Sequence, residues 1–173
     1  MNPKEENHME KISVEQQVIG LIVWLVLCFS ASAVGAIASI EAQSFYGSLN
    51  QPSWAPPAWL FGPVWSTLYG MMAVAAWLIW RRGGFKLNQT ALTLFLIQLM
   101  INGLWSWVFF VWNLGSGSFV NVIVLWVVIS FTLAMFWRTD KLAGILLVPY
   151  LLWVSFACAL NYTVWQLNPQ ILG

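Results

Sequence analysis

The sequence predicts an all-α integral membrane protein, folded as a bundle of five transmembrane helices. Hydrophobic residues make up 60% of its 173 residues, charged residues make up only 8%, and the mean hydropathy is +0.75. A water-soluble domain is usually about 45–50% apolar and about 25% charged, because its surface is too large for its volume to hide more apolar surface. A helix needs about 20 mostly apolar residues to cross a bilayer core of about 30 Å. Five stretches meet this requirement, namely 18–40, 63–80, 90–112, 119–137 and 142–165.

The basic residues support the same count independently of hydropathy. With five spans, all seven lysines and arginines fall on one side of the membrane, and they are Lys4, Lys11, Arg81, Arg82, Lys86, Arg138 and Lys141. Lys and Arg in short loops stay on the cytoplasmic side. The amino terminus is therefore predicted to be cytoplasmic and the carboxyl terminus to lie on the opposite side.

The chain is expected to form a single membrane domain, residues 18–173, behind a polar tail of residues 1–17. A signal peptide is the alternative for the first span, because residues 18–29 precede Ala31-Ser32-Ala33, which resembles a cleavage site. Four glutamates in the leading segment and the continuation of the apolar run to Ile40 favour a retained span.

Asp, Glu, Lys, Arg and His are absent from the middle of every predicted span. Proton relays, voltage sensors and ion-coupled pumps depend on such residues, so these classes are disfavoured. Glu41 ends the first span and Asp140 lies in a loop, so both are expected to be solvated. Cys28 and Cys158 lack the closely spaced partners of a metal site, and no basic run could bind a nucleic acid. The remaining residues favour binding of a flat, hydrophobic ligand, with no metal and no required cofactor.

Thirteen tryptophans are the most unusual feature of the composition. Several lie near span ends, as an interfacial aromatic belt predicts. The first loop lies between the first two spans, at residues 41–62, and the stretch from Pro52 to Trp65 contains four prolines, which hold the backbone extended and cannot continue a helix. This loop, with Trp54, is either a lid across the mouth of the bundle or a segment that anchors to lipid headgroups. After the loop, Trp65 and Tyr69 share one helix face.

Two further helical stripes combine aromatic rings with amides. They consist of Gln98, Asn102, Trp105 and Phe109 in the third span, and of Trp153, Ala157, Leu160 and Asn161 in the fifth. Because amides are costly against lipid, both stripes should face the bundle interior. They form either the walls of a slot for a planar ligand or ordinary contacts between helices, hydrogen-bonded through the amides.

These segments together resemble the TspO family, called tryptophan-rich sensory protein in bacteria and translocator protein in mitochondria. The motifs that carry the resemblance are Trp54-Ala55-Pro56-Pro57, Phe61-Gly62-Pro63-Val64-Trp65 with Leu68-Tyr69, Gln98 with Asn102 and Trp105, and Tyr150 with Trp153, Phe156-Ala157 and Leu160-Asn161. The resemblance implies a five-helix bundle with a cavity under the first loop, and usually a homodimer. It implies binding of protoporphyrin IX, haem and drugs of the benzodiazepine and isoquinoline carboxamide types, with lipids or sterols as further candidates.

By motif, the resemblance also implies which residues bind the ligand: Trp54, Trp65, Tyr69, Gln98, Asn102, Trp105, Trp153, Phe156, Ala157, Leu160 and Asn161. Some members are proposed to degrade protoporphyrin in light, and Trp65 and Trp153 would then be the catalytic residues. Animal members carry a basic residue shortly after the Leu-Asn-Tyr of a cholesterol motif. Here Leu160-Asn161-Tyr162 is followed by Gln166 instead, so cholesterol is not the expected ligand.

Three functions fit these features. The first is a membrane receptor or carrier for tetrapyrroles, with a transport, scavenging or stress-sensing role. The second is a light- and oxygen-dependent porphyrin-degrading enzyme, and the third is a membrane scaffold or regulatory partner. Short loops and the charge pattern indicate a multi-pass protein of a bacterial cell membrane.

Overall fold

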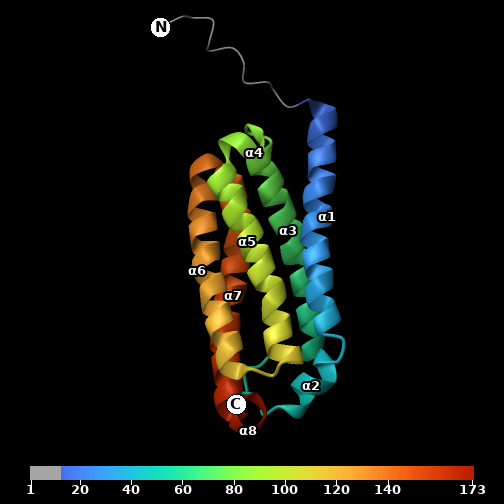
Figure 1. Ribbon diagram of the computed structural model, residues 1–173, viewed down its shortest axis with the longest axis vertical. Helices are drawn as coiled ribbons and strands as arrows, with labels where there is room; N and C mark the ends of the chain where they lie inside the picture. The colour runs from blue at the N-terminus through green and yellow to red at the C-terminus, as the bar shows by residue number, and fades with distance from the viewer. Residues whose placement is uncertain (1–12) are drawn as a thin grey trace, which may run out of the picture.

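The computed structural model describes residues 13–173, and this part of the chain is helical without strands (Figure 1). Five helices are long and apolar enough to cross a membrane. In chain order the elements are α1 (Val14–Ala38), α2 (Ala42–Ser48), the 3-10 turn η1 (Ala58–Leu60), α3 (Phe61–Trp80), α4 (Gly84–Leu87), α5 (Gln89–Ser106), the π-helical turn η2 (Trp107–Val111), α6 (Gly115–Thr139), α7 (Lys141–Leu167) and α8 (Pro169–Leu172). The predicted fold class and the five spans are confirmed.

The five long helices form a closed ring. Helix α1 packs on α3 and α5, α3 packs on α7, and α6 joins α7 to α5. Following these contacts around the bundle gives the order α1, α3, α7, α6, α5. Each helix therefore has one face toward the centre of the ring and another toward lipid.

Helix α1 begins four residues before the span that hydropathy predicts. The Ser13 side chain accepts the backbone N–H of Gln16, and the Gln16 side chain accepts that of Ser13, which is a capping box. Residues 14–17, assigned to the polar tail, are thus the first turn of the helix with Ser13 as its cap, and residues 1–12 of that tail lie outside the described residues. Hydropathy misses this turn because a helix can begin in water before it enters lipid.

The first loop is more ordered than its prolines predict, since it contains α2 and η1. The prolines hold the stretch between these two elements, where no helix forms. The four-residue α4 makes the connection between α3 and α5 at the other end of the bundle (Figure 1).

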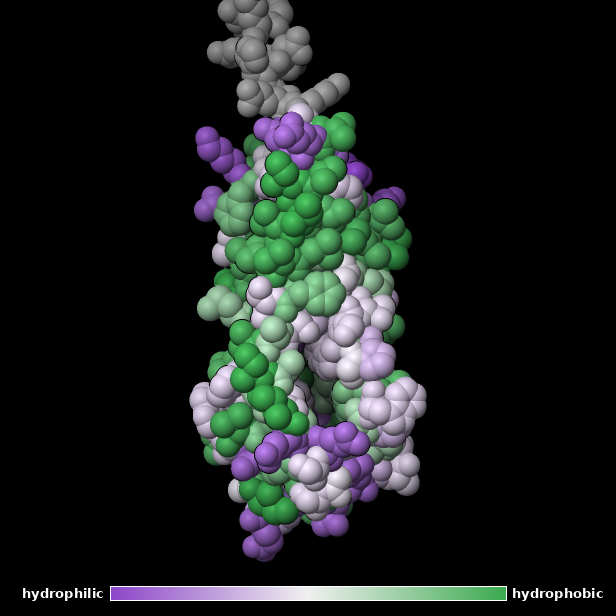
Figure 2. Space-filling view, turned by 90° about the vertical axis from the view of Figure 1, so that its right-hand side faces the viewer, coloured by the Kyte–Doolittle hydropathy of each residue, from purple (hydrophilic) through white to green (hydrophobic). Residues whose placement is uncertain are grey.

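The described basic residues gather at one end of the bundle, as the sequence predicts. Arg81, Arg82, Lys86, Arg138 and Lys141 lie at the end of α3, in α4 and at the junction of α6 with α7, all near the start of α1 (Figure 1). Hydrophilic surface marks both ends of the molecule, and a hydrophobic surface lies between them (Figure 2). Which end faces the cytoplasm stays a prediction.

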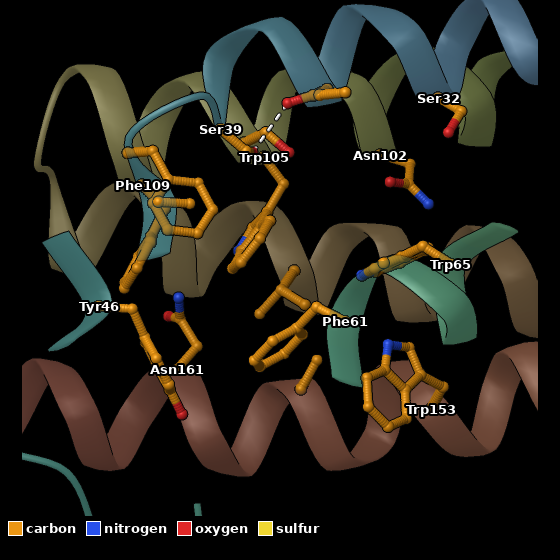
Figure 3. A pocket seen from close by; sticks show the side chains of 18 of the residues that line it. Ser32, Ser39, Tyr46, Phe61, Trp65, Asn102, Trp105, Phe109, Trp153 and Asn161 are labelled. Carbon is orange, nitrogen blue, oxygen red and sulfur yellow. Dashed lines mark hydrogen bonds between the residues drawn. The ribbon is translucent and has the colours of Figure 1, made fainter. Parts of the chain in front are cut away.

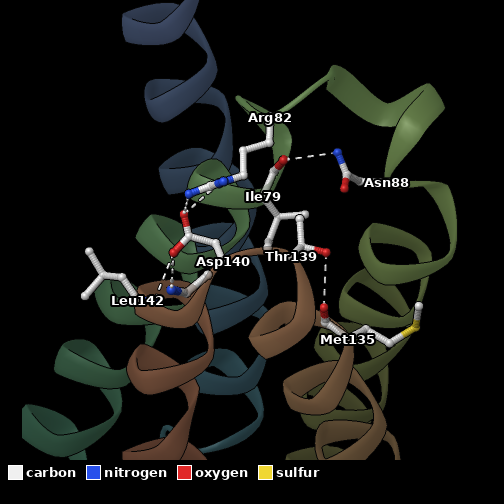
Figure 4. A network of polar contacts seen from close by, with 8 residues as sticks. Ile79, Arg82, Asn88, Met135, Thr139, Asp140 and Leu142 are labelled. Atoms are coloured by element: carbon white, nitrogen blue, oxygen red, sulfur yellow. Dashed lines mark hydrogen bonds and ion pairs between the residues drawn. The ribbon is translucent and has the colours of Figure 1, made fainter.

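Asp140 corrects one expectation, because its side chain is buried and not solvated, with an exposed fraction of 7%. It is the N-cap of α7, where its Oδ1 accepts the N–H groups of Leu142 and Ala143 at 2.9 and 3.3 Å (Figure 4). Its Oδ2 accepts from Nε and Nη2 of Arg82, each at 2.8 Å. Burial by itself would raise the pKa of Asp140, but the bonds from Ala143, Arg82 and Leu142 lower it below its ordinary value. The carboxylate thus stays charged and ties α3 to the start of α7.

Candidate ligand-binding site

A cavity of about 460 Å³ lies inside the ring, in the half of the bundle away from the basic residues. Its walls come from all five long helices, and α2 and η1 cover its end. Figure 2 shows it opening as a hollow in the lower half of the side that carries α1. A volume of this size is within the range of about 300–1,000 Å³ typical of small-molecule sites.

Eight of the eleven predicted ligand-binding residues line this cavity, namely Trp65, Tyr69, Asn102, Trp105, Trp153, Ala157, Leu160 and Asn161. They come from α3, α5 and α7, so the three stripes recognised in the sequence do converge on one space (Figure 3). Both amide-bearing stripes face the interior: Gln98, Asn102 and Asn161 are exposed by 1, 5 and 3%. That these residues bind a ligand remains a prediction.

The other three predicted residues lie outside the cavity lining. Gln98 is one helical turn from Asn102, toward the packed half of the bundle, and is buried there. Trp54 packs edge-on against Phe156 at 5.8 Å between ring centroids, and Phe156 packs against Trp153 at 5.4 Å. Trp54 and Phe156 therefore support the wall residue Trp153 from behind.

A chain of buried hydrogen bonds holds the polar part of the wall in place. Tyr69 donates to Oδ1 of Asn102 at 3.2 Å, and Asn102 Nδ2 donates to the hydroxyl of Tyr150 at 2.8 Å. Tyr150 in turn donates to Oε1 of Gln98 at 2.7 Å. Gln98 is thus part of the contact between helices, while Asn102 joins that contact to the cavity. The two bonds use half of the hydrogen-bonding capacity of the Asn102 amide.

The π-helical turn η2 shapes an aromatic wall that periodicity does not predict. Trp112 N–H bonds to the carbonyl of Trp107, five residues back, and the wider turn brings both Phe109 and Phe110 to the cavity. The rings of Trp105 and Phe109 are stacked 5.3 Å apart at 8°, and Phe110 stands across Phe109 at 89°. Helical periodicity predicted Phe109 on this stripe but did not predict Phe110.

Helices α1 and α2 supply wall residues for which the sequence offered no functional signal. Ser32 and Gly35 of α1, and Ser39 directly after it, line the cavity. Small residues such as Gly35 also permit close contact between helices. That contact also exists: a Cβ at Gly35 would lie 3.2 Å from Oγ of Ser106 in α5. Tyr46 comes from α2, which the sequence did not predict as a helix.

The polar groups of the cavity wall are neutral, because its lining contains no Asp, Glu, Lys, Arg or His. Among the described residues, the buried Tyr46 hydroxyl and Trp105 Nε1 have no hydrogen-bond partner. Burial raises the pKa of Tyr46, so its hydroxyl keeps its proton. The arrangement suits a flat hydrophobic ligand held by ring contacts and a few neutral hydrogen bonds.

The chain is similar to known proteins over most of its length. The model of the TspO/MBR family matches residues 22–166. The chain is 41% identical to Protein CrtK of Rhodobacter capsulatus over 85% of its length and 91% of the relative's. It is 40% identical to the Tryptophan-rich protein TspO of Chlorobaculum tepidum (90% and 100%) and 36% identical to the human Translocator protein (74% and 77%). The chain therefore belongs to the TspO/MBR family.

Proposed function

We propose that this protein is a membrane receptor or carrier that binds tetrapyrroles, such as protoporphyrin IX or haem, in the cavity inside its helical ring. Binding would serve transport, scavenging or stress sensing. The observation that carries the proposal is the cavity itself, which has a volume of about 460 Å³, is walled by aromatic rings from α2, α3, α5, η2 and α7, and is lined by no Asp, Glu, Lys, Arg or His. Family membership supports it, because relatives of the chain are named Tryptophan-rich sensory protein and Translocator protein.

The physical argument rests on the shape and chemistry of the wall. Large planar rings gain free energy from burial against other rings, with about 0.5–1.5 kcal/mol per well-placed aromatic pair beyond the area buried. The indoles of Trp65, Trp105 and Trp153 point into the cavity from three helices (Figure 3). Ala157 leaves space between Trp153 and Asn161 on the same helix, which is where the edge of a flat ligand would fit.

A dark titration of the detergent-solubilised protein with protoporphyrin IX tests the proposal, followed by porphyrin absorbance and tryptophan quenching. We expect saturable binding. Ala157→Leu should weaken it by about tenfold or more, because overpacking a closed site costs about 1–3 kcal/mol. Trp153→Phe should weaken it by about three- to tenfold through loss of ring contact.

Ala159→Leu is the matched control, since Ala159 lies on the same helix and is exposed on its outer face. It should bind porphyrin as the unchanged protein does. Binding that never saturates, or that is equally strong in Ala157→Leu and Trp153→Phe, would indicate partition of the porphyrin into detergent. The scaffold function would then be preferred.

A porphyrin-degrading activity is the second candidate, because Trp65 and Trp153 both line the cavity. An indole beside a photo-excited porphyrin can donate an electron, with dioxygen as the final oxidant. Illumination of the saturated complex in air should then bleach the Soret band faster than in the Trp65→Phe/Trp153→Phe double variant. Equal bleaching rates in both proteins would exclude these two residues as the reactive groups.

A further inference from the structure

The first loop is tied to the opposite end of the chain by a single side chain. Nδ2 of Asn168 donates to the carbonyl of Asn50 at 2.9 Å, and the N–H of Asn50 donates to Oδ1 of Asn168 at 2.8 Å. The Asn168 amide thus pairs with both main-chain groups of one residue, 118 positions away, as a neighbouring β-strand would. Its other N–H bonds to the carbonyl of Val164 at 2.7 Å, which fixes the amide to the end of α7.

This contact lies directly beside the cavity. Asn168 is exposed by only 4%, and Leu49, the neighbour of Asn50, is buried in a cluster with Val164 and Leu172. Val164 also lines the cavity. Figure 1 shows α8 and the segment after α2 together at this end of the bundle. The tie therefore joins the cover of the cavity to its wall.

The loop also packs on the bundle through side chains, since Phe45 stands edge-on against Phe109 and Phe110 and Leu49 is buried. Gln51 bonds to the carbonyl of Tyr46, and Ala55 bonds to that of Pro52, so both bonds stay inside the loop. The Asn50 side chain adds one contact to the carbonyl of Leu167, at 3.5 Å, and is exposed. Beyond the tie at Asn168, the loop is held to α7 by ring contacts such as Trp54 on Phe156.

We propose that Asn168 is the positioning residue that holds the first loop closed over the cavity, and that its two bonds to Asn50 limit how fast a ligand enters and leaves. This rests on the proposed function, because it assumes that a ligand occupies the cavity. The prolines between Pro52 and Pro57 make the loop stiff, so release at Asn50 moves the loop away as one body. A gate of this kind changes both rates of exchange more than it changes affinity.

The chain offers a closely matched pair of variants. Asn168→Ala removes the amide and both bonds to the loop, whereas Asn50→Ala keeps them, because Asn50 takes part through its main chain. Each variant removes one asparagine side chain at the same contact. Asn168→Asp keeps the side-chain size and the acceptor for the Asn50 N–H, but it sets an oxygen against the carbonyls of Asn50 and Val164, so it is a second way to break the tie if the alanine variant fails to fold.

Two measurements test the proposal on the whole protein in detergent. Hydrogen exchange of residues 42–60 needs no ligand, and it should be about tenfold faster in Asn168→Ala, as expected for the loss of two ordinary hydrogen bonds. Stopped-flow mixing with protoporphyrin IX should show association and dissociation both faster by about tenfold, with the dissociation constant changed less than threefold. Asn50→Ala should match the unchanged protein in both.

The outcomes are separable. Unchanged exchange of the loop in Asn168→Ala overturns the proposal, and so do unchanged porphyrin rates in a variant whose loop exchanges faster. A merely structural role would lower the unfolding temperature and speed exchange throughout the bundle, without a local effect. If the unchanged protein shows no saturable porphyrin binding, the proposed function fails, while the exchange of the loop still decides whether Asn168 holds it.

Discussion

Among single residues, Asp140 has two roles that contribute differently to the free energy of unfolding. It caps α7 and it pairs with Arg82, whose side chain is 52% exposed. Ion pairs with an exposed partner usually contribute about 0–1 kcal/mol, whereas a helix N-cap contributes typically about 1 kcal/mol. The cap should therefore account for most of the stability that Asp140 provides.

Substitution at Asp140 separates the two roles. Asp140→Asn keeps a capping oxygen and loses the charge, so it should lower the unfolding temperature less than Asp140→Ala does. The pKa of Asp140 is lowered in the folded protein by the bonds from Ala143, Arg82 and Leu142. The charged carboxylate therefore stabilises the folded protein at pH values above its ordinary pKa of 3.8, and this stabilisation is lost as the pH falls below that value. Thermal unfolding in detergent from pH 7 to pH 3 measures this. A difference between the unchanged protein and Asp140→Asn that grows toward low pH would contradict it.

Among elements, helices α6 and α7 are in close contact where Gly144 faces Trp137. A Cβ at Gly144 would lie 2.7 Å from the ring and 2.9 Å from the Cα of Trp137. The ring could rotate away, but the backbone of α6 could not move without disturbing the pair. Small residues permit such close helix contacts in membranes.

Gly144→Ala should therefore destabilise the bundle, although alanine favours a helix by about 1 kcal/mol over glycine. Overpacking costs about 1–3 kcal/mol, so a net loss of about 1 kcal/mol is expected. Gly70→Ala in α3 is the control, because a Cβ there meets nothing within 4 Å, and it should be neutral or stabilising. Thermal unfolding compares the two variants, and a Gly144→Ala protein as stable as Gly70→Ala would contradict the packing argument.

The whole molecule is packed in one half and hollow in the other. Met72, Ile79, Phe95 and Phe136 are fully buried and fill the ring at the basic end. The cavity occupies the opposite half and ends at Tyr69 and Asn102, where the packed half begins. This division favours a binding site that is closed toward the basic end over a pore through the bundle.

The charge pattern predicts that the basic end faces the cytoplasm and the cavity end the opposite side. Ser53 in the first loop and Phe85 in α4 are both exposed. Ser53→Cys should therefore react with a membrane-impermeant maleimide in intact cells. Phe85→Cys should react only after the membrane is permeabilised. The unchanged protein is the control for labelling of the native Cys28 and Cys158, which lie within spans. The reverse labelling pattern would invert the predicted topology.

Much of the site could be predicted because its residues follow helical periodicity. Asn102 and Trp105, like Trp153 and Ala157, recur at three or four positions, and the cost of an amide in lipid directs both stripes inward. Gln98 shows the limit of this argument. Periodicity places it on the correct face, but its depth along α5 and its bond with Tyr150 decide that it joins helices and does not line the cavity.

By itself, the sequence determined the number of spans, the inward faces of the third and fifth spans, and the family, since hydropathy, periodicity and motifs belong to short stretches of chain. Only the tertiary structure decided the burial of Asp140 against Arg82, the contribution of α1 to the cavity, and the tie between Asn50 and Asn168. These features join residues far apart in the chain. They depend on which helices become neighbours when the ring closes, and patterns within short stretches of sequence do not determine that arrangement.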